Sequence, residues 1–167
     1  ALYVKEDPTR IYHYNNLASH ILGYVDDQMI GVDGVENSFN DALKGEDGIR
    51  QVERSAGGRM ITVRDEDTKP SVPGLNIQLT IDKKVQSILE EELTEGVKTY
   101  NAISATGIIM NPNNGEILAL ANVGDYNPNN YSDYDDFTRK NRSITDVYEP
   151  GSTMKAISLA ALLDQNL

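Results

Sequence analysis

The chain has 167 residues, of which 39% are hydrophobic and 25% charged, a globular composition sufficient for one ordinary domain or two incomplete ones. Its 26 acidic and 15 basic side chains give a formal net charge of −11, which argues against nucleic acid or an anionic membrane surface as a direct partner. The absence of cysteine excludes a disulfide framework and a thiol nucleophile, and no apolar run reaches the roughly 18 to 20 residues of a membrane span.

The first part of the chain is predicted to contain short elements separated by glycines. Residues 12–25 have an apolar spacing that fits either a short helix or a strand. Residues 35–43 have helical spacing, with Gly34 before the helix and Gly45 at its end as the C′ residue.

Two strands and a linker follow. Residues 48–54 and 59–64 alternate between apolar and polar side chains as strands do, and a glycine pair between them predicts a turn. Residues 65–74 are charged, contain prolines and are nearly free of apolar side chains, which is typical of a linker. We therefore expect two domains, over residues 1–72 and 73–167.

The second domain is predicted to begin with a strand, a helix and a hairpin. Residues 76–81 alternate as a strand, and Asp82 is a suitable N-cap for the helix after it. That helix carries an apolar face, made of Val85, Ile88, Leu89 and Leu93. Residues 105–110 and 116–121 are apolar runs around the turn sequence Asn-Pro-Asn-Asn-Gly, which predicts a β-hairpin.

No metal or cofactor site is predicted. A zinc site would need both histidines together with carboxylates, and we expect His13 and His20 to be surface or packing residues. Residues 125–136 have oxygen-bearing side chains at a spacing similar to that of a calcium loop. However, Asn130 stands where such a loop needs glycine and Pro128 lies inside the turn, so we expect a plain polar loop.

The last segment carries the candidate chemistry. Ser152 stands three residues before Lys155 at the start of a helix, so the two side chains share a face and the amine can lie beside the hydroxyl. A serine hydroxyl becomes a nucleophile when a neighbouring base accepts its proton. Pro150 and Gly151 supply an abrupt turn, at which free backbone N–H groups can stabilise an oxyanion.

A bare Ser-x-x-Lys match is weak, because composition alone produces one in about every second chain of this length. On that reading Ser152 is an N-cap and Lys155 a solvated residue of the first turn. Context favours the catalytic reading, since this match is the only one in the chain and follows a Pro-Gly turn. Residues 156–163 beyond it are apolar on nearly every side, which predicts a buried helix.

Four motifs follow one another along the chain. They are Gly31-x-x-Gly34-x-Glu36 with Phe39, Leu43, Gly45 and Gly48; Leu79-Thr80-Ile81-Asp82 with Gln86; the hairpin of residues 110–121 with its Asn-Gly-Glu-Ile-Leu-Ala core; and residues 148–155. Taken together, they resemble the motifs of the class B penicillin-binding proteins. The chain looks like a piece of a monofunctional peptidoglycan D,D-transpeptidase, and the sequence Glu-Pro-Gly-Ser-Thr-Met-Lys favours the cell-division branch of that family.

The resemblance implies an α+β fold. A mixed pedestal (dimerisation) domain would be followed by the first part of a penicillin-binding, β-lactamase-like α/β/α sandwich with an antiparallel sheet. It also implies that Ser152 is the nucleophile, with its backbone N–H in the oxyanion hole, and that Lys155 is the general base. The implied partners are stem peptides ending in D-Ala-D-Ala, β-lactams, and membrane proteins of division or elongation, at the extracytoplasmic face of the bacterial inner membrane.

The chain also departs from the family. His13 stands where the family usually has proline after the tyrosine. The family's S-x-N and K-T-G motifs do not occur downstream of Ser152, and its membrane anchor does not occur upstream. Because the sequence starts without methionine and stops at Leu167 beside an apolar helix, we expect a catalytically inert fragment. Its exposed strand edges and apolar surface favour disorder or an element-exchanged dimer.

Two other functions fit parts of the sequence. A serine β-lactamase or β-lactam sensor shares the Ser-x-x-Lys helix but lacks the glycine framework of residues 31–48. A non-catalytic pedestal or interaction module is the other alternative. The sequence downstream of Leu167 would separate an enzyme from such a module, through the presence or absence of the two missing motifs.

Overall fold

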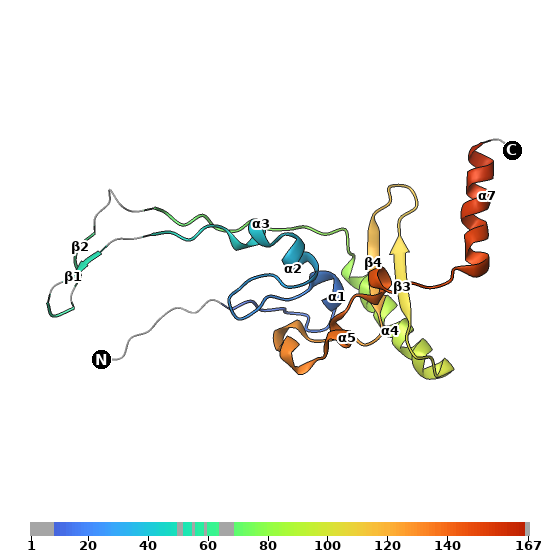
Figure 1. Cartoon of the computed structure of the whole chain (residues 1–167), viewed down its shortest axis with the longest axis horizontal. Coiled ribbons are helices and arrows are strands. Elements are labelled where there is room, and N and C mark those ends of the chain that lie inside the picture. The colour runs from blue at the N-terminus through green and yellow to red at the C-terminus, as the bar shows by residue number, and fades with distance from the viewer. Residues whose placement is uncertain (1–8, 50–51, 55, 59, 64–68, 166–167) are drawn as a thin grey trace.

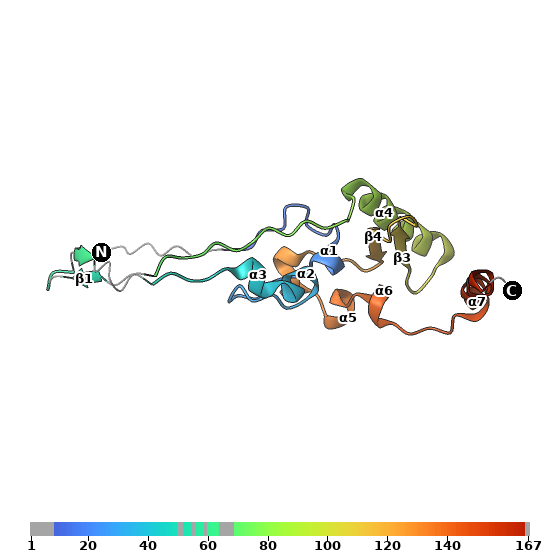
Figure 2. The same cartoon turned by 90° about the horizontal axis from the view of Figure 1, so that it is seen from above.

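The computed structural model describes residues 9–49, 52–54, 56–58, 60–63 and 69–165. An arm carrying strands β1 and β2 extends from one end of a central body, and helix α7 stands apart at the opposite end (Figure 1). A view from above shows the same elongated arrangement (Figure 2). The body therefore holds most of the packing contacts, and it joins residues from both halves of the chain.

Three short helices form the first part of the body: α1 (Ser19–Leu22), α2 (Gly34–Ser38) and α3 (Asn40–Lys44). Within residues 12–25 the helical alternative is found, as turns that lead into α1. The prediction of one helix over residues 35–43 is wrong, because Phe39 (φ −117°, ψ 22°) leaves the helical region and separates α2 from α3.

Glycine is required where these helices meet. A Cβ atom on Gly31 would lie 1.9 Å from the carbonyl oxygen of Glu36, and Gly34 has φ +57°, a left-handed conformation that side chains disfavour. Gly34 is the first residue of α2, not the residue before it, and the Asp33 carboxylate accepts from its N–H at 2.8 Å. The predicted helix end at Gly45 is confirmed, although Gly45 is the C-cap of α3 (φ +68°, ψ −161°) and not its C′ residue.

The arm is an antiparallel ribbon. Strands β1 (Val52–Arg54) and β2 (Met60–Val63) pair as predicted from the two alternating segments, of which residues 50, 51, 59 and 64 lie outside the described residues. Residues 65–68 of the predicted linker lie outside the described residues. Residues 69–72 do not form an unpaired linker, because Lys69 pairs with Ile49 and Val72 with Glu46 through backbone hydrogen bonds. The domain boundary at residue 72 stays a prediction.

The strand predicted over residues 76–81 is wrong. This segment forms no strand, and isolated backbone hydrogen bonds flank it on both sides. Leu75 N donates to Ala42 O at 2.8 Å, and Asp82 N donates to Leu118 O at 2.9 Å. An alternating pattern makes a strand only where a partner supplies a continuous ladder, and none runs beside this segment among the described residues.

The second part of the body is a helix packed on a hairpin. Helix α4 (Lys83–Tyr100) begins at the predicted N-cap Asp82, whose carboxylate accepts from the N–H groups of Lys84 and Val85. The predicted hairpin is confirmed, with β3 (Thr106–Met110) antiparallel to β4 (Ile117–Asn122). Helix α4 packs against this sheet, and α1 and α6 also contact β4. Consecutive side chains of a strand point to opposite faces, so the burial of Ala119, Leu120 and Ala121 shows that both faces of β4 are covered there.

Short elements complete the chain: η2 (Pro128–Asp133), α5 (Asp136–Arg139), α6 (Arg142–Thr145), η3 (Gly151–Thr153) and α7 (Met154–Asp164). In the polar loop of residues 125–136, the Asn127 side chain caps η2 and that of Asp135 caps α5. The predicted burial of the Ser152 helix is wrong for this chain, since every described residue of α7 is exposed. No described helix has the length and apolar character needed to cross a membrane.

Candidate active site

The turn before α7 is built by residues 150–153. Pro150 is in the right-handed helical region (φ −71°, ψ −20°), and Gly151 follows with φ +50°, a left-handed conformation suited to glycine. The N–H and hydroxyl of Thr153 both donate to the carbonyl oxygen of Pro150, the N–H at 3.1 Å. These contacts close a single turn of 3₁₀ helix that continues directly into α7.

Ser152 lies in this 3₁₀ turn, and Lys155 is the second residue of α7. Their spacing places both side chains on one face, and both residues are exposed. The structure brings them onto the same turn without a hydrogen bond between Ser152 Oγ and Lys155 Nζ. The Ser152 N–H has no backbone acceptor among the described residues, so it is free to donate to an incoming oxygen.

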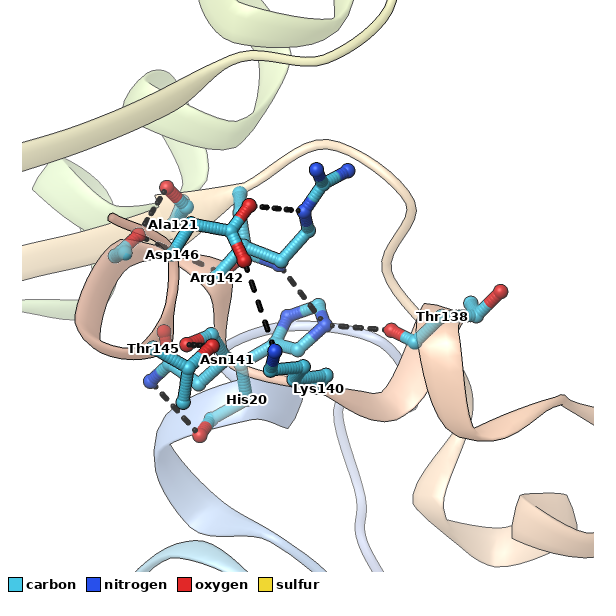
Figure 3. A network of polar contacts seen from close by, with 10 residues as sticks. His20, Ala121, Thr138, Lys140, Asn141, Arg142, Thr145 and Asp146 are labelled. Carbon is cyan, nitrogen blue, oxygen red and sulfur yellow. Dashed lines mark hydrogen bonds and ion pairs between the residues drawn. The ribbon is translucent and has the colours of Figure 1, made fainter. Parts of the chain in front are cut away.

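The segment leading to this turn is fixed at α5 and α6. Arg142 Nε donates to Asp146 Oδ2 at 2.7 Å, and Lys140 Nζ lies 3.8 Å from Asp146 Oδ1 (Figure 3). Ser143 Oγ donates to the carbonyl oxygen of Ala121 in β4 at 3.2 Å. Among the described residues, none after Asp146 makes a hydrogen bond to any part of the chain before residue 147.

His20 is the buried centre of the contacts that hold α5 and α6. It is 5% exposed, and its Nε2 lies 2.9 Å from the carbonyl oxygen of Thr138 (Figure 3). Asn122 Nδ2 lies 3.1 Å from the same nitrogen, and Asn141 Nδ2 donates to the His20 carbonyl oxygen at 3.3 Å. The sequence analysis predicted that each histidine is a surface or a packing residue. His13 is exposed and His20 is packed in the interior, but the prediction did not include the polar contacts of His20.

The aromatic and acidic neighbours of this centre are also fixed by burial and hydrogen bonds. Tyr126 is fully buried and meets the His20 ring edge to face, with ring centroids 5.4 Å apart. Burial, and after it the charge of Asp33, raises the pKa of the Tyr126 hydroxyl above its usual range. Hydrogen bonding from Thr138 lowers the pKa of the Asp135 carboxyl that caps α5.

Clefts and carboxylate clusters do not mark a second site. A cleft of about 550 Å³ lies between α4 and the end of β4, and it includes neither Ser152 nor Lys155. The Ser152 turn is exposed to solvent and does not line this cleft. In the part of the chain that the structure describes, no group of three His, Asp or Glu side chains is arranged to hold a metal ion.

Comparison with known proteins identifies both parts of the chain. Residues 1–79 match the family model of the penicillin-binding protein dimerisation domain, and residues 105–167 match that of the penicillin-binding protein transpeptidase domain. The chain belongs to the class B penicillin-binding proteins.

Two curated relatives match nearly the whole chain. Stage V sporulation protein D of Bacillus subtilis is 37% identical over 165 residues, which are 98% of this chain and 26% of the relative. Peptidoglycan D,D-transpeptidase FtsI of Escherichia coli is 34% identical over 166 residues, which are 99% of this chain and 28% of the relative. The chain thus spans about a quarter of the length of the curated relatives that it matches.

A solved structure supports the fold. A peptidoglycan synthetase from Bifidobacterium adolescentis aligns with a TM-score of 0.77 and 28% identity, over 93% of this chain and 28% of that one. The α+β fold class predicted from the sequence is confirmed.

Proposed function

We propose that this chain is part of a peptidoglycan D,D-transpeptidase, which cross-links stem peptides through a serine acyl-enzyme and is acylated by β-lactams. Family membership and the names of the relatives support the activity. The observation that carries the assignment of residues is the Gly151 turn, which sets Ser152 and Lys155 on one face at the start of α7. Residues 1–72 would belong to the pedestal domain and 73–167 to the transpeptidase domain.

The proposed chemistry has two acyl transfers. Lys155 Nζ accepts the Ser152 proton while Oγ attacks the carbonyl carbon between the two terminal D-alanines of a stem peptide. The carbonyl oxygen becomes an oxyanion, to which the free Ser152 N–H donates. The peptide bond then breaks, the departing D-alanine nitrogen takes the proton from Lys155, and an ester to Ser152 remains.

In the second transfer the amine of another stem peptide attacks this ester. Its proton passes through Lys155 to Ser152 Oγ, so the cross-link forms and the serine is restored. A β-lactam enters by the first step, but opening its ring releases no separate leaving group. The serine therefore stays blocked as an ester.

The setting of this activity is part of the proposal. The site would lie at the extracytoplasmic face of the inner membrane, and membrane proteins of division or elongation would be its partners. No cofactor takes part in the two transfers. Because α7 is exposed along its whole length, the 167-residue chain alone leaves Ser152 and Lys155 in open water. We propose that the chain by itself is inactive.

The test uses a full-length protein that contains this chain. After exposure to penicillin, intact-protein mass spectrometry should show one adduct, which Ser152→Ala abolishes. Ser158→Ala is the matched control, because it removes an exposed serine of the same helix whose hydroxyl only donates to the Met154 carbonyl. An adduct that survives Ser152→Ala would show that another residue is the nucleophile.

Lys155→Arg tests the base. Arginine keeps the positive charge but does not give up its proton near neutral pH, so this variant should fold and fail to acylate. Near-normal acylation would place the base elsewhere. An adduct that forms on Ser152 and is rapidly hydrolysed would instead favour the β-lactamase alternative.

A further inference from the structure

Three consecutive residues of the first half of the chain, 18–20, are held by separate elements of the second half. Ala18 N donates to Glu90 Oε1 of α4 at 2.8 Å. The Ser19 carbonyl oxygen accepts from Tyr126 Oη at 3.2 Å. His20 joins β4 and α5, through its contacts with Asn122 and Thr138. The start of α1 is therefore a joint between the two halves.

The His20 ring contacts α5, the first of the two helices that lead to the Ser152 turn. A carbonyl oxygen only accepts, so the 2.9 Å approach of Nε2 to Thr138 O requires a proton on Nε2. If the Asn122 side-chain amide is rotated by half a turn, its Oδ1 faces the ring and can accept from the same Nε2–H group. His20 thereby ties α5 to α1 with a single N–H donor, and the residue is 5% exposed.

From this joint the chain runs to Ser152 through α5 and α6. After Thr138, Arg139 Nη1 donates to Tyr24 Oη at 3.2 Å, Asn141 contacts the His20 carbonyl, and the Ser143 hydroxyl donates to Ala121 O. Helix α6 also packs against β3 and β4. Beyond Asp146 the described residues make no hydrogen bond back to the body, and Ser152 lies six residues farther along. The position of α5 and α6 thus sets where the Ser152 turn departs.

We propose that His20 is a positioning residue through which the pedestal controls the rate of acylation at Ser152. The inference rests on the proposed function and deepens it. His20 does not touch the reacting atoms. Its Nε2 proton fixes Thr138, and through α5 and α6 it fixes the departure point of the Ser152 turn. A displacement of about 1 Å at a reacting group far from the cause costs about a hundredfold in rate.

A histidine that only fills the core predicts a different result. Its loss would lower the fraction of folded protein, and hence the amplitude of acylation, while each folded molecule reacted at the normal rate. Mispositioning leaves the amplitude intact and lowers the first-order rate constant. The two effects separate in a stopped-flow or quenched-flow time course.

The experiment compares variants of the full-length protein with fluorescent penicillin. His20→Phe keeps a ring against Tyr126 and removes the donor, whereas His20→Gln keeps an N–H that can reach Thr138 O. Arg10→Gln is the matched control, since it breaks the 2.7 Å pair with buried Glu36 in the first half of the chain without touching α5. Hydrogen exchange of residues 138–146 is measured on the same samples and reports placement independently of activity.

We expect His20→Phe to lower the acylation rate constant about tenfold or more at full amplitude, and to raise exchange in residues 138–146. His20→Gln should restore both, and Arg10→Gln should change neither. A normal rate constant in His20→Phe, failure of His20→Gln to restore it, or equal slowing in Arg10→Gln would each overturn the proposal. If wild type forms no Ser152 adduct, the proposed function fails, and unchanged exchange in His20→Phe would separately refute the joint.

Discussion

Replacing Gln86 with leucine should break the contact between α4 and β4. Gln86 is 1% exposed, and its side chain pairs with a strand residue as another strand would. Its Nε2 donates to Leu120 O at 2.9 Å, and its Oε1 accepts from Leu120 N at 2.9 Å. Nε2 also donates to Glu90 Oε1 at 2.8 Å. Leucine has similar volume, so the change removes polar partners with little loss of packing.

The magnitude follows from the groups that leucine leaves behind. The N–H and C=O of Leu120 both become buried without a partner, and each costs about 1–3 kcal/mol. Apolar burial of the new side chain returns about 1 kcal/mol, leaving a net loss of about 1–5 kcal/mol with a centre near 3. If the free energy required for local opening falls by about 3 kcal/mol, the Leu120 amide exchanges about a hundredfold faster.

The assay is amide hydrogen exchange read by NMR, with Ser87→Ala as the control on an exposed position of the same helix. The control should leave the Leu120 amide within about threefold of wild type, because surface changes cost about 0.5 kcal/mol or less. If Leu120 exchanges at the wild-type rate in Gln86→Leu, the side-chain bridge does not hold β4 and the reasoning fails.

Three further predictions concern other parts of the chain. Asp82→Ala should destabilise α4 by about 1–2 kcal/mol, because two backbone N–H groups lose the carboxylate that caps them. Urea unfolding followed by circular dichroism measures this loss, and the control Lys84→Ala should not show it. Asp135 should titrate by NMR below the ordinary aspartate midpoint of about 3.9, and Thr138→Ala should raise it. Because the pKa of Asp135 is lower in the folded than in the unfolded chain, its carboxylate stabilises α5 at a pH above the unfolded pKa, and this stabilisation is lost as the pH falls through the folded pKa. Asp135→Asn should remove this pH dependence of stability. A wild-type Asp135 that titrates at the ordinary midpoint would contradict the prediction. The 167-residue chain should self-associate through the exposed Leu159 and Leu162. Sedimentation of the Leu159→Glu, Leu162→Glu double variant should therefore show a monomer. A monomeric wild-type chain that binds fluorescent penicillin would refute the interpretation of the chain as an inert fragment.

Local patterns predicted the elements whose partners lie nearby in the sequence. Asp82 as an N-cap, Gly45 after its helix and the β3–β4 hairpin depend on contacts within a few residues or across one turn. The strand over residues 76–81 failed because alternation does not reveal whether a partner strand is present. The single helix over residues 35–43 failed because Phe39 continues the apolar spacing while its backbone leaves the helix.

The site shows the same division. Ser152 and Lys155 could be singled out because three residues of spacing carry the geometry. The role of His20 could not, since its partners Asn122 and Thr138 lie 102 and 118 positions away and neither is unusual in its local sequence. Polar contacts of this range are specified by the fold as a whole, and no single-sequence pattern records them.

The distant contacts of residues 12–20 also constrain the order in which the chain can mature during synthesis. Tyr12 meets Asn129 across 117 positions, and His20 meets Asn141 across 121. Closing loops of this length is entropically costly and slow, so the ribosome must deliver most of the chain before the earliest segment gains its final neighbours. Until then α1 can pack only against α2, and a nascent chain halted before residue 120 would present the rest of that segment's surface to chaperones and proteases.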